Sequence, residues 1–260
     1  MSVFTSKAVR SVVAKFAALL TVLMFALLRP FQRLMHRYSR VGDGEFFDPG
    51  KFAWVPALEE NWRQIRRELD HVLQYADDIP NFQDISAENR ALTDDDGWKT
   101  FFFHAWGIRV ASNCARCPAT AALLDRITGM KSAFFSILLP QKHLPPHRGP
   151  YAGVLRYHLG LIVPDGVRCR LRVGNRVEHW QEGRSLIFDD TFEHEVWNDT
   201  DAVRVVLFVD VTRPLPFPLS AINALTMRAI SRSSLVQPGL EKFAEWDRRL
   251  AKVWRPAPPA

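Results

Sequence analysis

GVLRYHLGLIV, residues 153–163, has the two-residue alternation of a β-strand. One face of this strand carries leucines, a tyrosine and a valine. The other face is also largely apolar, but it includes Arg156 and His158. Strands that are apolar on both faces are usually buried on both faces. The two polar side chains are therefore predicted to point into the protein interior.

Further short strands are predicted around this one, and turns such as Pro164-Asp165-Gly166 and Gly174-Asn175 separate them. The predicted strands cover residues 133–139, 153–163, 168–173, 177–180, 185–188 and 203–211. Short strands that follow one another without intervening helices are typical of a sandwich or a barrel. The fold is therefore predicted to be mainly β.

The last of these strands places an arginine, Arg204, on a face that it shares with Val206, Phe208 and Asp210. A guanidinium in such a position costs free energy unless it is paired. A carboxylate is its best partner, because the planar fork of the guanidinium binds both carboxylate oxygens. Two partners remain open at this point: an internal acid such as Asp210, or the carboxylate of a bound small molecule.

Two histidines lie at strand ends of the same predicted barrel: His147 in PPHRGP and His194 in FEHEVW. A lone histidine usually has a structural role, but two in this arrangement can hold iron, copper or zinc. Two histidines and a carboxylate form the open site of non-haem Fe(II) oxygenases. Gly149 stands where the carboxylate is expected. The residues alone therefore indicate a two-histidine metal site whose third ligand is unknown.

Length and composition fit one well-cored domain with extensions, since the chain has 260 residues, of which 47% are hydrophobic and 24% charged. Helical spacing of apolar residues predicts a helix over 57–75, and 118–127 reads as a short helix. We expect a helical and loop region at 41–131 and a β core at 132–215. Residues 216–260 are expected to be a helical extension with a disordered, proline-rich tail.

The N-terminal region, residues 1–40, is predicted to be a membrane anchor with basic flanks. Phe16 to Leu28 form 13 residues without a charge, and lysines or arginines lie on both sides. A helix needs about 20 apolar residues to cross a bilayer, so this segment either spans or is half-embedded. A signal peptide or a buried core helix fits less well. The heavier positive charge after the segment places the main body on the cytoplasmic side of the inner membrane.

The net charge of +6 would suit an anionic surface, either phospholipid headgroups or nucleic acid. Because basic residues flank the apolar segment, a membrane is the expected partner and nucleic acid is not. Three cysteines exclude a disulfide scaffold. Cys114 and Cys117 form a single CxxC, which indicates packed thiols or a redox pair rather than a zinc site. The sequence does not indicate an oligomeric state.

The motifs PPHRGP, LRYHLGL, QEGRSLIFDD, FEHEVW and VLFVDVTRP strongly resemble the aspartyl/asparaginyl β-hydroxylase family. The resemblance covers about residues 50–215. It implies a double-stranded β-helix, or jelly roll, with flanking helices. It also implies a dioxygenase that uses Fe(II), 2-oxoglutarate and O2.

The resemblance also implies roles for individual residues. His147 and His194 match the two iron-binding histidines, and Gly149 matches the family's glycine at the position where most such dioxygenases carry an acid. Arg204 matches the arginine that binds the distal carboxylate of 2-oxoglutarate. Further contacts to this co-substrate are expected from Ser136, Arg156 and His158. No catalytic residue is expected beyond the metal site.

Bacterial branches of the family hydroxylate the 2-position of acyl chains in lipid A and ornithine lipid. The apolar N-terminus, the positive charge and the apolar region 219–230 favour such a membrane lipid as substrate. Lipid A hydroxylases carry an aspartate at the position of Gly149, so ornithine lipid is the preferred expectation. The alternatives are hydroxylation of a peptide or protein, and a non-catalytic β-helix that binds a metal or a small acid.

Overall fold

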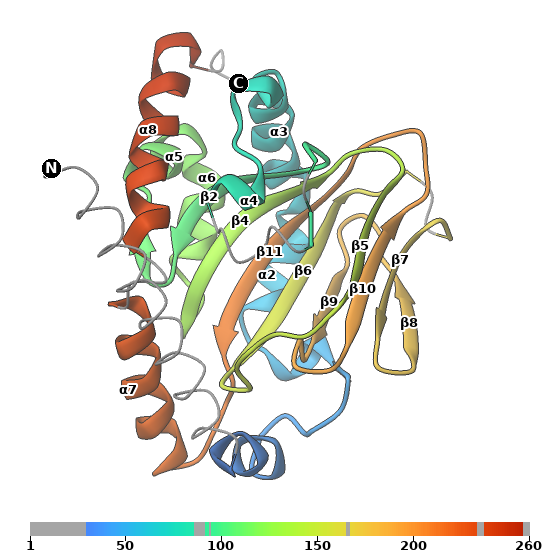
Figure 1. Ribbon diagram of the computed structural model, residues 1–260, viewed down its shortest axis with the longest axis vertical. Helices are drawn as coiled ribbons and strands as arrows, with labels where there is room; N and C mark the ends of the chain where they lie inside the picture. Colours follow the sequence, from blue (N-terminus) through green and yellow to red (C-terminus); the bar gives the residue numbers. More distant parts are fainter. Residues whose placement is uncertain (1–29, 86–91, 94, 165–166, 233–236, 257–260) are drawn as a thin grey trace, which may run out of the picture.

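The computed structural model describes residues 30–85, 92–93, 95–164, 167–232 and 237–256, and Figure 1 shows two β-sheets that face each other. The larger sheet has the strand order β1-β9-β6-β11-β4-β2-β3. Its strands are β1 (Phe46–Phe47), β2 (Trp98–Ala105), β3 (Ile108–Arg109), β4 (Met130–Leu138), β6 (Val154–Ile162), β9 (Ser185–Phe188) and β11 (Arg204–Thr212). All of its strand pairs are antiparallel.

The smaller sheet has the order β5-β10-β7-β8 and is also antiparallel. Its strands are β5 (Lys142–His147), β7 (Cys169–Val173), β8 (Arg176–His179) and β10 (His194–Asn198). From β4 to β11 the chain passes repeatedly between the two sheets. The resulting orders, β4-β11-β6-β9 facing β5-β10-β7-β8, are those of a double-stranded β-helix. The prediction of a mainly β fold of this kind is confirmed.

Both faces of the larger sheet are buried, because one packs on helices and the other on the smaller sheet. Leu155 and Tyr157 of β6 and Leu207 of β11 belong to the core beneath the helices. Val206 and Phe208 of β11 belong to the core between the sheets. The alternation predicted for these two strands is therefore confirmed. It directs the side chains of Arg156, His158 and Arg204 to the space between the sheets.

Helices cover the outer face of the larger sheet and one of its ends (Figure 1). They are α2 (Val55–Glu60), α3 (Trp62–Leu73), α4 (Phe82–Ile85), α5 (Ala111–Arg116), α6 (Pro118–Leu124), α7 (Leu219–Ser231) and α8 (Gln237–Val253), with 3₁₀ turns at Pro49–Lys51 and Ala76–Asp78. α3 buries Ile65, Leu69 and Val72 against the sheet. These three residues have helical spacing, which explains why this helix is predictable from the sequence.

A separate cluster joins residues 30–37, which are helical, to α7. Met35 contributes from the first helix, and Leu219, Met227 and Ile230 contribute from α7. Tyr151, in the loop between β5 and β6, completes this contact. The two helices therefore lie beside the loop that follows His147.

Several elements differ from the sequence predictions. The helix expected over 57–75 is divided into α2 and α3 at Asn61. β2 lies in a region expected to be helix and loop, although it pairs with β4 along most of its length. β5 and β10 were expected to be loop and turn, yet they form the centre of the candidate site described below.

The predicted anchor, Phe16 to Leu28, lies outside the described residues, as does the end of the proline-rich tail, residues 257–260. Within the described part of the chain, no helix combines the length and the hydropathy that a membrane span requires.

Leu207 provides a test of the core beneath the helices. Its side chain is 0% exposed in the middle of β11. Leu207→Ala should lower the free energy of unfolding by about 2–5 kcal/mol, because burial is lost and a cavity remains. Leu225→Ala is the control, since that leucine is 64% exposed and its replacement should change stability by less than about 0.5 kcal/mol. Equal effects of both variants in chemical denaturation would contradict the burial described here.

Candidate active site

One pocket between the two sheets is lined by all six residues predicted to form the site. They are Ser136, His147, Arg156, His158, His194 and Arg204. The larger sheet supplies four of them, from β4, β6 and β11, and the smaller sheet supplies the two histidines at the end of β5 and the start of β10. Apolar side chains such as Trp98 and Phe188 form much of the remaining wall.

Antiparallel pairing of β5 with β10 places His147 directly opposite His194. The two imidazole ring centres are 4.0 Å apart. Nδ1 of His147 is 2.8 Å from the carbonyl oxygen of Pro145, and Nδ1 of His194 is 3.0 Å from that of Phe192. A carbonyl accepts, so each Nδ1 donates its proton and each Nε2 keeps the lone pair. Backbone carbonyls orient metal-binding histidines in this way.

Both imidazoles are held in the neutral form that a metal ligand requires. Burial lowers the pKa of His194 to about 2, and the neighbouring His147 and Arg156 act in the same direction. Burial also lowers the pKa of His147, although its hydrogen bond to Pro145 opposes the shift. Oriented, neutral imidazoles of this kind fit ferrous iron, for which histidine nitrogen is a suitable donor.

Within the described part of the chain, no third protein ligand completes the pair. Among the described residues, no group of three or more histidine, cysteine, aspartate or glutamate side chains is arranged to hold a metal ion. The space beside Gly149, where an acidic side chain would begin, is filled by the carboxylate of Asp190. A Cβ added at Gly149 would overlap all three atoms of that carboxyl group. Gly149 is therefore required here by packing.

Asp190 is fixed in this position by an ion pair. Its Oδ2 lies 2.9 Å from Nη2 of Arg156, and Nε of the same arginine lies 3.2 Å from Oδ1 of Asp210. The other oxygen of Asp190, Oδ1, is buried and has no hydrogen-bond partner in the described structure. Burial raises the pKa of Asp190 to about 6, and Arg156 opposes the shift. Arg156 thus lines the pocket with its charge already balanced by two carboxylates.

Arg204 has no such partner. The sequence left open a pairing with Asp210, but that acid pairs with Arg156. Nε and Nη1 of Arg204 are buried without a hydrogen-bond partner among the described residues. The guanidinium lies 4.6 Å from the ring centre of Trp180, and burial lowers its pKa to about 10. A buried cation in this condition fits the carboxylate of a small molecule bound in the pocket.

His158 and Ser136 add further polar groups to the same wall. Both ring nitrogens of His158 are buried without a partner in the described structure, and burial holds its pKa well below the ordinary value. Ser136 accepts a hydrogen bond of 3.0 Å from the indole nitrogen of Trp98. Its hydroxyl proton is therefore available to an acceptor in the pocket. Together with Arg204 these groups can bind an anion that has several oxygens.

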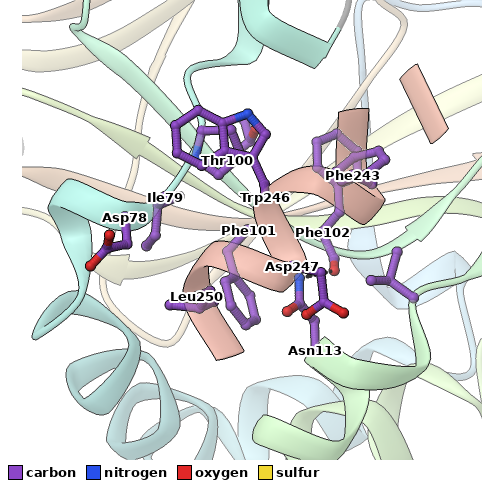
Figure 2. Close-up of a pocket in the computed structure, with 12 residues that line it drawn as sticks. Asp78, Ile79, Thr100, Phe101, Phe102, Asn113, Phe243, Trp246, Asp247 and Leu250 are labelled. Atoms are coloured by element: carbon purple, nitrogen blue, oxygen red, sulfur yellow. Dashed lines mark hydrogen bonds between the residues drawn. The ribbon is translucent and has the colours of Figure 1, made fainter. Parts of the chain in front are cut away.

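A second pocket lies where α8 crosses β2 and has a different character. Figure 2 shows aromatic side chains around it, among them Phe101, Phe102, Phe243 and Trp246. Its charged neighbour Asp247 is already bound by Arg116 at 2.6 Å. Its lining holds no histidine or cysteine. We interpret it as the packing interface between α8 and the larger sheet.

The two cysteines of the CxxC motif are packed in the hydrophobic core. Cys114 and Cys117 are buried free thiols, and burial raises the pKa of both. A thiol with a raised pKa is unreactive. Sequence reasoning gave no role to Asp190 or Trp180, although both lie against predicted site residues. The paired acids of FDD, four residues before His194, were the available signal for Asp190.

Comparisons with known proteins identify several similar sequences. The family model described as aspartyl/asparaginyl β-hydroxylase matches residues 59–214 of this chain. The chain is 44% identical over 214 residues to the ornithine lipid ester-linked acyl 2-hydroxylase of Rhizobium tropici, which covers 82% of this chain and 76% of that protein. It is 37% identical over 173 residues to the aspartyl/asparaginyl β-hydroxylase of Mus musculus, covering 64% of this chain but 22% of the mouse protein.

Similar solved structures include the cupin domain of an XRE family transcriptional regulator from Enterobacter cloacae. That match has a TM-score of 0.32 and 10% identity, and it covers 44% of this chain and 96% of the other.

Gly149→Ala tests the packing of Asp190. The added methyl group should lower the free energy of unfolding by about 1–3 kcal/mol, because it competes with a buried carboxylate for the same space. When Asp190 is already replaced by alanine, Gly149→Ala should lower the free energy of unfolding by clearly less. A double-mutant cycle measured by denaturant unfolding would give this difference.

Gly44→Ala is the matched control for that cycle, since its Cβ would make only an ordinary contact of 3.5 Å. Additive effects of Gly149→Ala and Asp190→Ala would show that the two positions are not coupled.

Proposed function

The chain belongs to the aspartyl/asparaginyl β-hydroxylase family, and from this premise we propose that it is an Fe(II)- and 2-oxoglutarate-dependent dioxygenase that hydroxylates the 2-position of an acyl chain in a membrane lipid. Ornithine lipid is the preferred substrate. The observation that carries the substrate proposal is the 44% identity to a named ornithine lipid acyl 2-hydroxylase across 82% of this chain.

His147 and His194 would hold the iron through their Nε2 atoms. Bound iron and 2-oxoglutarate would supply the chemistry that activates O2 and inserts one oxygen atom into a C–H bond. Two protein ligands leave more coordination positions open than a histidine-histidine-carboxylate site does. The buried Oδ1 of Asp190, which has no hydrogen-bond partner among the described residues, could accept a hydrogen bond from a water molecule held at this site.

Arg204 would bind the far carboxylate of 2-oxoglutarate, with Ser136 and His158 as further contacts. Anchoring that end fixes the direction of the molecule, so its reacting end meets the metal in one pose. The apolar walls around these groups exclude water and strengthen each charge contact. Arg156 would act mainly by holding Asp190, since its charge is already balanced.

We also propose that residues 1–40 attach the protein to the inner membrane, with the β core on the cytoplasmic side. Hydroxylation of a peptide remains the second candidate. The 37% identity to mammalian aspartyl/asparaginyl β-hydroxylases favours it, as does the glycine at position 149.

The substrate proposal is tested with purified protein, Fe(II), 2-oxoglutarate, O2 and ornithine lipid in detergent. We expect succinate and a lipid product heavier by one oxygen atom, which fragmentation in a mass spectrometer should place at carbon 2 of an acyl chain. His147→Ala and His194→Ala should reduce the product to background while the protein stays folded, because each removes a metal ligand.

His143→Ala is the control for those variants. This histidine lies on the same strand, β5, but its side chain is 44% exposed and pairs with Glu195, so activity should persist. Full activity of His147→Ala would reject the assigned metal site. Succinate formed with a peptide but with no lipid would favour the second candidate.

Arg204→Ala should raise the concentration of 2-oxoglutarate needed for half-maximal rate by roughly 10- to 150-fold, the cost of one charge-assisted contact. The requirement for lipid should change far less. Arg176→Ala, on the exposed strand β8, should leave both unchanged. Steady-state rates at varied concentrations measure the two requirements. An unaltered 2-oxoglutarate requirement in Arg204→Ala would remove this residue from co-substrate binding.

A further inference from the structure

Two neighbouring segments expose an unusual amount of apolar surface. Half of the ten large hydrophobic side chains exposed in the described structure belong to residues 30–38 or to residues 217–231. Phe217 is 82% exposed, Leu225 64% and Tyr38 51%, and Phe31 and Leu34 are each more than a third exposed. Single exposed apolar residues are normal, but a group of them marks an interaction surface. We call these outer surfaces together the basic apolar face.

The two segments lie side by side. Met35 of the first helix is 0% exposed and belongs to the same cluster as Leu219, Met227 and Ile230 of α7. Figure 1 shows residues 30–37 and the start of α7 together at the lower end of the molecule. The exposed side chains therefore belong to two helical segments that share one buried cluster.

The charge of this face is predominantly positive, although the exposed acid Asp43 lies near His36 of the first helix. The sequence contains no aspartate or glutamate from residue 1 to residue 42, and none from 211 to 240. The exposed basic side chains of the two segments are Arg33, Arg37 and Arg228, and the exposed Arg40 and Arg232 lie within two residues of the segment ends. Apolar side chains mixed with arginines and without acids are typical of segments that bind anionic phospholipid. A second protein would be expected to offer acids at fixed places, whereas a lipid surface needs no such match.

The basic apolar face borders the loops that carry the metal-site histidines. Gln32 donates a hydrogen bond of 3.4 Å to the carbonyl of Pro150, three residues after His147. Asn223 of α7 accepts a hydrogen bond of 2.9 Å from Tyr151 and donates one of 2.7 Å to the carbonyl of Gly153. Both helices thus hold the loop that follows His147.

The loop that leads to His194 is also attached to the first of these helices. Nδ1 of His36 lies 3.3 Å from Oδ2 of Asp189, which precedes Asp190 in the segment leading to His194. Arg213 forms a buried ion pair with the same carboxylate. The loops of both metal-site histidines are therefore attached to the helices that carry the exposed apolar side chains.

We infer that the basic apolar face lies on an anionic phospholipid bilayer and brings the mouth of the pocket to the membrane surface. A lipid acyl chain would then reach the site without leaving the membrane for water. This inference rests on the proposed lipid hydroxylase function and adds to it the surface through which the substrate arrives.

The test uses the full chain with a single added cysteine, Leu34→Cys or Leu225→Cys, that carries an environment-sensitive fluorophore. The native cysteines are buried, so they should not take up the label. Vesicles of phosphatidylglycerol should shift both labels to shorter wavelength, and quenchers attached to the lipid acyl chains should quench them. Val177→Cys, 48% exposed on β8 in the smaller sheet, should show neither change.

The role of charge is tested in the same assay with Arg33→Glu/Arg37→Glu added to Leu225→Cys. Each arginine-to-glutamate change should weaken the response to phosphatidylglycerol by at least roughly fivefold, because it removes a positive charge and adds a negative one, and phosphatidylcholine should elicit little response in any variant. Arg176→Glu/Arg184→Glu is the matched charge control, because Arg176 on β8 and Arg184 just before β9 are both exposed and lie outside the two segments.

Three outcomes would overturn the inference. Labels that stay in water while the protein sediments with vesicles would mean that residues 1–29 alone hold the protein. If the labels are shielded from water without vesicles and the protein is a monomer, another part of the same chain covers the face. If they are shielded without vesicles and the protein is a dimer, a second copy of the chain covers it. Hydroxylation of detergent-solubilised ornithine lipid is measured in parallel. If no hydroxylated lipid forms while the labels are buried in lipid, the proposed function is rejected but the membrane contact of the basic apolar face is not.

Discussion

The antiparallel pairing of β5 with β10 is the contact on which the candidate site depends. It sets two imidazoles opposite each other, and the backbone carbonyls of Pro145 in β5 and of Phe192 just before β10 orient the two rings. Neither histidine has a defined position without the other strand. The larger sheet contributes a wall of polar groups across the pocket, so the site exists only because the two sheets face each other.

Charge within the pocket is distributed unequally between two arginines. Arg156 is balanced by Asp190 and Asp210, whereas the described residues form no ion pair with Arg204 and place the ring of Trp180 against it. Strand register explains the difference, because Asp210 lies directly opposite Arg156. The molecule therefore keeps one guanidinium occupied as a support and leaves the other available to a ligand. Removal of Arg156 would leave two buried carboxylates unpaired, whereas removal of Arg204 would leave no unpaired charge behind, so the two deletions should affect stability differently.

The sequence was informative wherever burial left a regular pattern. β6 and β11 are apolar on both faces, so their polar residues could be assigned to the interior before the structure was known. β5 could not be found in this way because Pro145 and Pro146 are unusual in strands. Prolines are tolerated here because β5 is an edge strand of the smaller sheet. The contact of Asp190 with Gly149 joins separate loops, and no local pattern encodes it.

The packing of a carboxylate against Gly149 has a consequence for how firmly the proposed site would hold a metal. If two neutral imidazoles are the only protein donors, no anionic ligand offsets the charge of a divalent ion, and fewer bonds resist its departure. We expect iron to exchange with solvent more readily than in a three-ligand site. The uncompensated charge would also attract a dianionic keto acid, so metal retention and co-substrate binding should reinforce each other.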